Sequence, residues 1–419
     1  MSGIKIPLDR IQVGLHVKLP LKWMEHPFLF NEFKIKDAQQ LNLIRNMGVK
    51  YVYVNPSKSK ASILPPNASL FKPLKMEESQ ELDKIAKSLW EEKQKRIKKQ
   101  QAYKRKIQRC ENNYNNSMSQ LRSILSTINS RPLDAVEGAG LLVDSMVETL
   151  LAEDNVTLHL MNNTKERDEI YSHSLNVTIL SMLVAKAARM SGKEIKTLAM
   201  SALFHDMGKL KLPSSIIRKT TPLTKPEENY FKLHTQYSLE MAKTVDGFSP
   251  TVKTVVYQHH ECIDGSGYPR QLTGKNIHPL AQLIAVTDQF DRLCHPQNPA
   301  ETRSPHESLS FLFKAKSKQF NNNYMALLAK SVGIYPPGSI VQLSDQQIGI
   351  VISVNTNQSL SPSVLLYNPV IPSDQALIID LAESNLKIVG MVPREKLSQE
   401  MVNYLNPSDS NLYYLDGNS

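Results

Sequence analysis

The sequence predicts a mainly α-helical protein with a small mixed α/β module before the helical region and a small β-rich module after it. Apolar residues recur at helical spacing through residues 118–333, for instance at Leu121, Ile124 and Leu125. Before this region apolar residues alternate, and after Ile334 two prolines and a glycine precede short β-branched runs. We therefore expect four parts: a module over residues 1–72, a helix over 73–117, a helical domain over 118–333 and a β-rich module over 334–419.

The composition is that of an ordinary folded protein. The chain has 419 residues, of which 41% are apolar and 21% charged, enough for two or three domains. Cys110, Cys262 and Cys294 are widely spaced and form no CxxC motif, which argues against a disulfide framework and a thiolate zinc site. No basic segment precedes a long apolar run, and no stretch approaches 18 uninterrupted apolar residues. We expect a reducing, cytoplasmic location without a signal peptide or a membrane span.

The first module is expected to contain strands and one helix. The alternating positions Ile11, Val13, Leu15, Val17 and Leu19 predict a half-buried strand that ends before Pro20. Asp37 is placed to cap a helix over AQQLNLIRNM, which Gly48 would end. Strand character returns over residues 49–54.

Much of the formal charge of +10 lies in one segment. Residues 91–109 contain nine Lys or Arg against two Glu, are rich in helix formers and lack Gly and Pro. We interpret this segment as a solvated linker helix, with contact to a membrane surface, nucleic acid or a partner protein as the alternative. No aromatic interleaving or nucleic-acid motif accompanies the charge, so DNA is not an expected partner. A homodimer or a signalling partner through the first module and this helix is the interaction we expect.

In the helical region, histidines and carboxylates stand where ligands of a metal ion would be useful. His205 and Asp206 follow an apolar approach over residues 198–204, and a buried carboxylate needs a compensating partner such as a divalent cation. Glu169 and His173 are one helical turn apart, so they would project together. The remaining candidates are His234, His259 and His260 after a helix-like segment, and Asp288 at the end of an apolar stretch. Each residue alone is more typical of a hydrogen-bonded core or cap position, but their joint occurrence favours a metal site.

Lys209 follows His205 by four residues, so on a helix its ammonium would lie on the same face and could approach the oxyanion of a phosphate. The turn-like segment from Asp264 to Pro269 is glycine-rich, and Gly265 and Gly267 suit a tight turn.

These motifs resemble those of the HD-GYP family. The resemblance lies in HD-x-GK-x-x-x-P at His205, Asp206, Gly208, Lys209 and Pro213, and in HHE-x-x-DGSGYP from His259 to Pro269. It covers about half of the chain and implies an all-helical HD-superfamily catalytic domain that hydrolyses cyclic di-GMP to pGpG and in some members to GMP. The implied metal ligands are His173, His205, Asp206, His234, His259, His260 and Asp288, with Glu169 as the additional carboxylate of three-metal members. The implied catalytic residues are Asp206, which bridges the metals, and Lys209, which assists at the phosphate; Lys209 is also an implied substrate contact, with Asp264, Gly265, Gly267, Tyr268 and Pro269.

Two or three divalent metal ions are therefore expected, and Glu169 favours three. Imidazole and carboxylate ligands without thiolate suit iron, manganese, zinc, nickel or cobalt, and the resemblance favours iron or manganese. Paired metals can activate water and hold the attacking and leaving oxygens of an in-line displacement, so no protein nucleophile is needed.

One segment departs from the family pattern. Members commonly continue after the last ligand with DAL-x-x-x-R-x-Y, whereas this chain reads DQFDRLCHPQNPAETRSP. Gln297 stands near the expected arginine, a change that would weaken substrate binding by about 1–3 kcal/mol unless Arg292 or Arg303 substitutes. Two alternative functions remain open for this reason: a metal-containing sensor of cyclic di-GMP, and a phosphohydrolase of another nucleotide. The outer modules resemble segments that accompany one HD-GYP subgroup, where they suggest regulation or dimer contacts.

Overall fold

The structure, a computed structural model, forms two compact units, residues 1–104 and residues 105–419. It describes residues 3–22, 25–28, 31–65, 76–152, 156–161, 169–245, 247–356, 358–369, 371, 373, 376–405 and 412–417. No helix among these residues combines the length and the apolar character that crossing a membrane would require.

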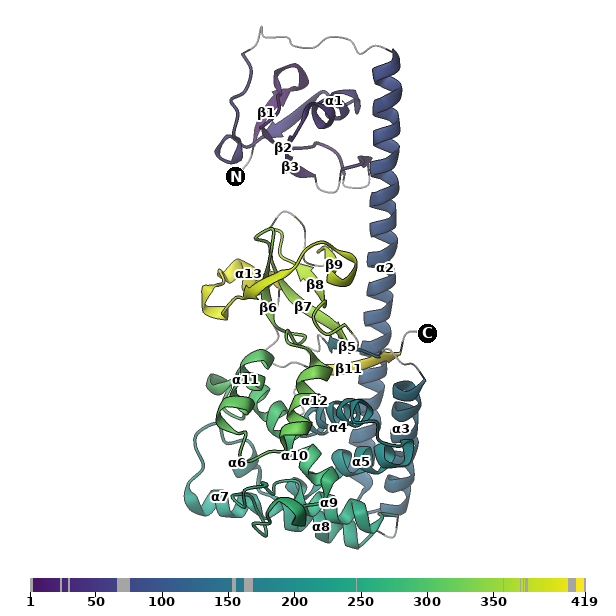
Figure 1. Ribbon diagram of the computed structural model, residues 1–419, viewed down its shortest axis with the longest axis vertical. Coiled ribbons are helices and arrows are strands. Elements are labelled where there is room, and N and C mark those ends of the chain that lie inside the picture. The colour runs from purple at the N-terminus through teal and green to yellow at the C-terminus, as the bar shows by residue number, and fades with distance from the viewer. Residues whose placement is uncertain are drawn as a thin grey trace. The chain divides into compact units, whose positions relative to one another are not determined.

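The first unit contains a four-stranded antiparallel sheet with the order β1-β4-β2-β3. Its elements are β1 (Ile4–Pro7), β2 (His16–Lys18), β3 (Glu32–Lys34), α1 (Ala38–Asn46), β4 (Tyr51–Val54) and the beginning of α2 (Met76–Thr127) (Figure 1). Side chains of all these secondary-structure types meet in one apolar core, for example Val17, Val52, Ile44 and Leu82.

The predicted helix of this unit is confirmed, because Asp37 caps it by accepting a hydrogen bond from Gln40 N at 2.8 Å. The predicted strand over residues 11–19 is wrong in length, since only His16–Lys18 pairs as β2. Gly14 has φ +95°, which turns the backbone, and Val13 is 39% exposed. The alternating apolar residues other than Val13 are buried, but they lie in a bent segment and not in one continuous strand.

The basic segment is helical, as predicted, but it is not wholly solvated. Lys93 is 2% exposed, and its ammonium donates hydrogen bonds to the carbonyl oxygens of His26 at 2.7 Å and Phe28 at 2.9 Å. Its aliphatic stem lies on the face of α2 that also packs Leu82 and Leu89 into the core of the first unit. This lysine is therefore part of the packing of the first unit.

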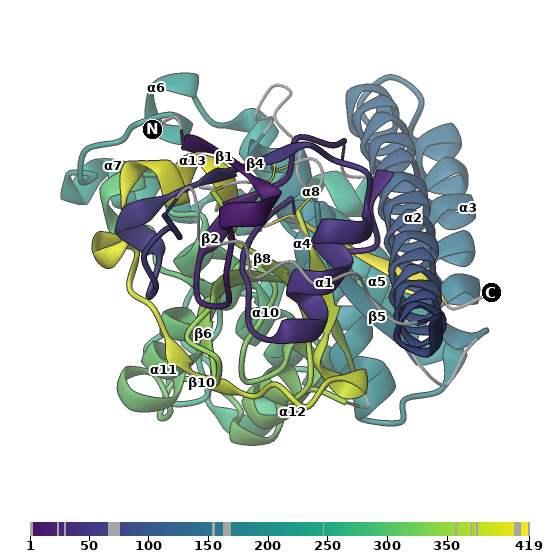
Figure 2. The ribbon, with the colours of Figure 1, turned by 90° about the horizontal axis from the view of Figure 1, so that it is seen from above.

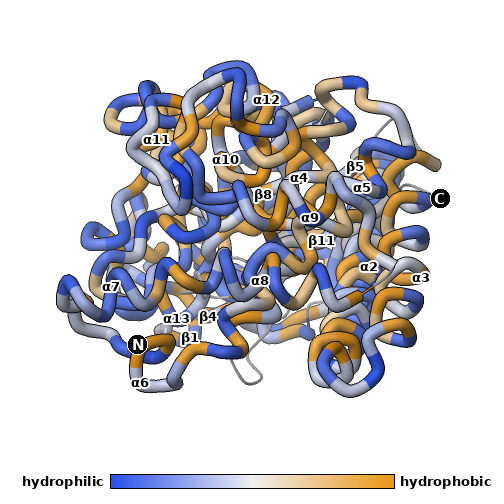
Figure 3. The backbone as a smooth tube through the Cα atoms, turned by 90° about the horizontal axis from the view of Figure 1, so that it is seen from below, coloured by the Kyte–Doolittle hydropathy of each residue, from blue (hydrophilic) through white to orange (hydrophobic). Residues whose placement is uncertain are grey.

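The second unit has a helical core that surrounds the predicted metal ligands. The helices are the end of α2, α3 (Pro132–Leu151), α4 (Glu169–Ala187), α5 (Gly192–Phe204), α6 (Ser214–Ile217), α7 (Lys225–Lys232), α8 (His234–Lys243), α9 (Pro250–Gln258), α10 (Pro279–Cys294), α11 (Pro305–Ala315) and α12 (Asn322–Val332). The end of α2 lies beside α3 (Figure 2). Hydrophobic stretches are prominent along α10, whereas hydrophilic residues predominate along α7 (Figure 3). The mainly α fold class is confirmed.

A seven-stranded antiparallel sheet completes the second unit. Its path is β10-β6-β7-β5-β11, and β8 pairs with both β7 and β9. The strands are β5 (Val156–Met161), β6 (Ile340–Leu343), β7 (Ile348–Asn355), β8 (Ser363–Leu366), β9 (Ile378–Asp380), β10 (Ile388–Met391) and β11 (Leu412–Gly417), and the module also contains the helix α13 (Gln399–Leu405). Strand β5 lies within the part of the sequence expected to be helical and pairs with β7 and β11.

Candidate active site

In four histidines of the second unit, the ring nitrogen Nδ1 is held by a hydrogen bond, and Nε2 is directed toward a group of other histidines and carboxylates. In His205, His234 and His259, Nδ1 lies 2.6–2.7 Å from the carbonyl oxygen three residues earlier, so Nδ1 donates to that carbonyl. Nδ1 of His173 lies 2.7 Å from a carboxylate oxygen of Asp291. A neutral imidazole held in this way presents the Nε2 lone pair, the form in which histidine binds a metal.

Ends of helices position most of these ligands. His205 is the C-cap residue of α5, His234 begins α8, and His259 is the C-cap residue of α9 with His260 next to it. His173 lies one turn into α4. Asp288 was expected at the end of a buried element, and this is wrong: it lies in the middle of α10, where packing of α10 against α4 brings it within 2.9 Å of Nε2 of His173.

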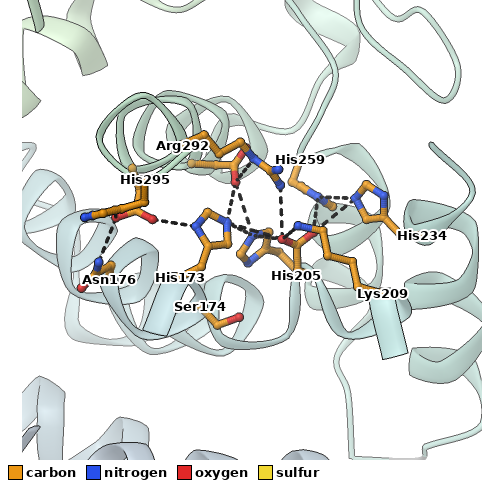
Figure 4. A network of polar contacts seen from close by, with 12 residues as sticks. His173, Ser174, Asn176, His205, Lys209, His234, His259, Arg292 and His295 are labelled. Atoms are coloured by element: carbon orange, nitrogen blue, oxygen red, sulfur yellow. Dashed lines mark hydrogen bonds and ion pairs between the residues drawn. The ribbon is translucent and has the colours of Figure 1, made fainter. Parts of the chain in front are cut away.

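Asp206 is shared by two overlapping clusters of donor atoms. Figure 4 shows four of the histidines of these clusters, His173, His205, His234 and His259. The first cluster contains Asp206, His234, His259 and His260, and the second contains His173, His205, Asp206 and Asp288. Within each cluster, one donor atom per residue lies within 4.8 Å of the others. Among the described residues, Oδ1 of Asp206 is buried without a hydrogen-bond donor, while Nε2 of His234 lies 3.2 Å from it. The chemistry of the two donor sets, with Asp206 common to both, would suit two divalent cations.

Burial and the neighbouring charges act in opposite directions on these groups. Burial raises the pKa of Asp206, but the Lys209 ammonium and the other cationic neighbours outweigh burial and hold that pKa well below its usual range. Burial lowers the pKa of His173, but hydrogen bonds to Asp206, Asp288 and Asp291 raise it to about 10. Burial lowers the pKa of His259 to about 4. The site therefore combines ionised carboxylates with imidazoles that differ in their affinity for a proton.

Asp291 holds His173 from the side opposite the clusters. Its Oδ2 accepts from His173, while its Oδ1 accepts from Asn176 Nδ2 and His295 Nδ1, each at 2.9 Å. The spacing of three residues from Asp288 puts both carboxylates on the same face of α10. Asp291 thus fixes the ring orientation and the tautomer of His173.

Lys209 contacts Asp206, but it does not share a helical face with His205 as predicted. Helix α5 ends at Phe204, and the chain turns through residues 205–206 into the 3₁₀ helix η4 (Met207–Lys211). This turn brings Nζ of Lys209 to 2.5 Å from Oδ2 of Asp206. Gly208 permits the turn because a Cβ there would collide with the His234 carbonyl and with Ser238 of α8.

The DGSGYP loop closes over His260. Its base is fixed by the buried carboxylate of Glu261, which accepts from Arg270 N at 2.7 Å and from Leu272 N at 2.8 Å. The Tyr268 ring packs against the His260 ring at 4.7 Å between centroids, and the Tyr268–Pro269 peptide is cis. Asp264 is exposed and accepts hydrogen bonds from the Ser266 backbone and hydroxyl, so its carboxylate shapes the turn. Gly265 has φ +81° in the same turn.

The segment after Asp288 contains an unexpected contact. Arg292 lies on α10, and its guanidinium contacts Asp288 and Asp206 (Figure 4). Gln297 lies elsewhere and donates a hydrogen bond to the Ile217 carbonyl at 2.7 Å. The guanidinium of Arg303 lies over the Phe311 ring at 4.5 Å. Of the two arginines considered as substitutes, Arg292 is the one in contact with the clusters.

Two known families match different parts of the chain. A domain of unknown function, DUF3391, matches residues 3–139, and the HD domain matches residues 146–323, which contain both donor clusters. This HD domain and the curated relatives confirm the resemblance to HD-GYP phosphodiesterases that the motifs indicated. The protein is a metal-dependent phosphodiesterase.

Three relatives are similar to this protein to different extents. It is 26% identical to the cyclic di-GMP phosphodiesterase PA4108 of Pseudomonas aeruginosa over 93% of its own chain and 92% of the relative. It is 30% identical to the cyclic di-GMP phosphodiesterase response regulator RpfG of Xanthomonas campestris over 51% of its chain and 55% of the relative. It is 32% identical to the 3'3'-cGAMP-specific phosphodiesterase 1 of Vibrio cholerae over 34% of its chain and 33% of the relative.

The HD domain brings together seven of the eight residues predicted as metal ligands. These are His173, His205, Asp206, His234, His259, His260 and Asp288. The eighth, Glu169, is the first residue of α4, and its side chain lies outside the described part of the chain. The predicted substrate residue Lys209 joins the clusters, Gly267 and Tyr268 line the adjoining loop, and Asp264, Gly265 and Pro269 shape its outer turn.

The sequence did not predict the contacts of Asn176, Asp291 and His295, and Arg292 was considered only as a substitute for the missing arginine. A signal was present within α10 and its C-cap, since Asp291 follows Asp288 by one helical turn, and Arg292 and His295 follow Asp288 and Asp291 by four residues each. The contacts of Asn176 with Asp291 and of Arg292 with Asp206 depend on how α10 packs against α4 and the turn at Asp206.

Proposed function

We propose that this protein hydrolyses cyclic di-GMP to pGpG, and that GMP can be a second product. The observation that carries the proposal is the pair of donor clusters that share Asp206 and lie beside Lys209. Such a pair suits the hydrolysis of a phosphodiester, because two cations can hold the attacking and the leaving oxygen. The name of the relative from Pseudomonas aeruginosa, matched over nearly the whole of both chains, supports cyclic di-GMP as the nucleotide.

The proposed ligands are Asp206, His234, His259 and His260 for one divalent cation, and His173, His205, Asp206 and Asp288 for another. Glu169 is proposed as a ligand for a third. When bound, these cations would supply Lewis acidity toward the phosphate and toward a water molecule. We propose iron or manganese as the native metal on the resemblance to the HD-GYP family, and the imidazole and carboxylate donors of both clusters suit either ion.

Residues of the chain would stabilise charge, orient a metal ligand and limit the access of water. Lys209 is buried and cationic beside Asp206, so it would stabilise negative charge that develops on the phosphate oxygens. Asp291 keeps Nε2 of His173 directed at the centre. Tyr268 covers the His260 ring and would limit the access of bulk water from that side. We propose that the loop containing Asp264, Gly265, Gly267, Tyr268 and Pro269 contacts the nucleotide.

The test combines metal analysis with product chromatography. Full-length protein purified without oxygen and loaded with iron or manganese is incubated with cyclic di-GMP and, separately, with 3'3'-cGAMP. We expect pGpG from cyclic di-GMP and a higher kcat/KM for that nucleotide than for 3'3'-cGAMP. Turnover of 3'3'-cGAMP alone would replace the proposed substrate, as the relative from Vibrio cholerae makes conceivable. Tight binding of cyclic di-GMP without turnover would indicate a sensor.

A further inference from the structure

The guanidinium of Arg292 lies against the oxygen atoms that one of the two donor clusters would offer to a cation. Its Nε–H is shared by both carboxylate oxygens of Asp288, at 2.8 and 2.9 Å. Its Nη2 lies 3.2 Å from Oδ2 of Asp206 and 3.5 Å from Nε2 of His260. One side chain thus spans both carboxylates of the cluster that contains His173, His205, Asp206 and Asp288.

The two clusters are not equivalent with respect to this side chain. Arg292 contacts both oxygens of Asp288 and Oδ2 of Asp206, whereas Oδ1 of Asp206 faces His234 and His259 at 3.2 and 3.6 Å. The second cluster must therefore exchange a guanidinium for a metal ion at Asp288. The first cluster can use Oδ1 of Asp206 and the rings of His234 and His259 without moving Arg292. Arg292 lies 3.5 Å from Nε2 of His260 in that cluster, but it holds none of the oxygen atoms that the first cluster would use.

Displacing Arg292 lowers the binding affinity of the metal, and the partial exposure of Arg292 allows its side chain to move. Charge-assisted hydrogen bonds between a guanidinium and buried carboxylates are among the stronger contacts in proteins, so displacing them subtracts from the metal's binding free energy. The Arg292 side chain is 27% exposed, compared with 1% for Asp206 and 3% for Asp288. Its guanidinium can consequently turn toward solvent while the two carboxylates stay in place.

We propose that Arg292 is an internal counter-cation that competes with a divalent metal for Asp288 and Asp206, and thereby makes the His173/His205/Asp206/Asp288 cluster the weaker of two unequal metal sites. Arg292 would leave these oxygens when the second metal binds. This inference rests on the metal centre of the proposed function and is independent of the identity of the nucleotide.

The experiment is a Mn²⁺ titration of chelator-treated, full-length protein, followed by the loss of the free Mn²⁺ resonance in electron paramagnetic resonance. The wild type should show a tight and a weak phase. The variant Arg292→Met keeps the apolar stem without the charge, and it should strengthen the weak phase by about 10- to 100-fold and leave the tight phase unchanged. The signal of a spin-coupled Mn²⁺ pair should then appear at a lower Mn²⁺ concentration than in the wild type.

Arg303→Gln serves as the matched control, because it removes an arginine charge from the same segment at a side chain that lies over Phe311. It should reproduce the wild-type titration. Arg292→Lys retains a positive charge and should give an intermediate weak phase, so it keeps the test decisive if Arg292→Met does not fold.

Identical weak phases in the wild type and in whichever Arg292 variant folds would overturn this inference and leave the proposed function intact. Strengthening of the tight phase alone would overturn it as well. If no protein bound Mn²⁺, both the inference and the metal centre would be rejected. Failure to hydrolyse cyclic di-GMP alongside the expected titrations would reject only the proposed substrate.

Discussion

Lys93 in the first unit and the donor clusters in the second are both buried polar sites, but their surroundings satisfy them differently. The Lys93 ammonium reaches two backbone carbonyls that need a donor. Around Asp206, by contrast, five histidines and two carboxylates face one another, and one buried carboxylate oxygen has no donor among the described residues. Burying polar groups in this arrangement destabilises a fold unless a cation compensates for it. The difference identifies the second site as a binding site and the first as structural.

Asp206→Asn should have the largest effect, because it removes the charge shared by both clusters. We expect kcat to fall by about 10³-fold or more and the bound metal to fall with it. Activity assays and elemental analysis of the same preparation would measure both. Asp144→Asn, at a half-exposed carboxylate paired with Lys196, is the matched control and should keep both values.

Lys209→Met should lower kcat by about 10²–10³-fold, since a buried cation at the phosphate acts mainly in the transition state. Metal content should stay close to that of the wild type. Lys211→Met, two residues along and 43% exposed, should have little effect on kcat. Equal losses in the two variants would show that the charge at Lys209 has no special role.

Asp291→Asn should weaken metal binding by about 10–100-fold, because His173 would lose the carboxylate that orients its ring. At saturating metal, kcat should recover most of its value. Titration with Mn²⁺ in the presence of substrate would separate the two quantities. A kcat that stays low at saturation would place Asp291 in the chemistry instead.

Lys93→Met should destabilise only the first unit, by about 1–3 kcal/mol, because two carbonyls lose their buried donor. Hydrogen exchange should become faster near His26 and Phe28, while metal content stays unchanged. Lys95→Met, at an exposed position two residues later, is the control. Loss of metal in Lys93→Met alone would contradict the assignment of a purely structural role.

The sequence was informative where local chemistry decides structure. The ligand types in the HD and HHE motifs lie at helix ends, as short-range patterns can indicate, and the cap at Asp37 followed from its position. The contact of Arg292 with Asp206 could not be predicted, because it depends on the packing of α10 against the turn at Asp206. The burial of Lys93 depends equally on a loop 65 residues away.

Strand β5 was not predicted, although its sequence carries a local signal. Val156, Leu158 and Leu160 alternate with Thr157 and His159 as in a half-buried strand, but the segment is short and both of its pairing partners come much later in the chain. Its residues pair with Ser353, Val354 and Asn355 on one side and with Leu412–Gly417 on the other.

This pairing has a consequence for biosynthesis. On the ribosome, the edge of β5 toward β11 remains without its partner until about 250 further residues have been translated. Helix α4, which carries His173, follows β5 directly in the sequence. The helices of the HD domain can therefore assemble early during translation, whereas the sheet beside them is completed only when residues 412–417 emerge, which leaves an exposed strand edge as a target for chaperones in the interval.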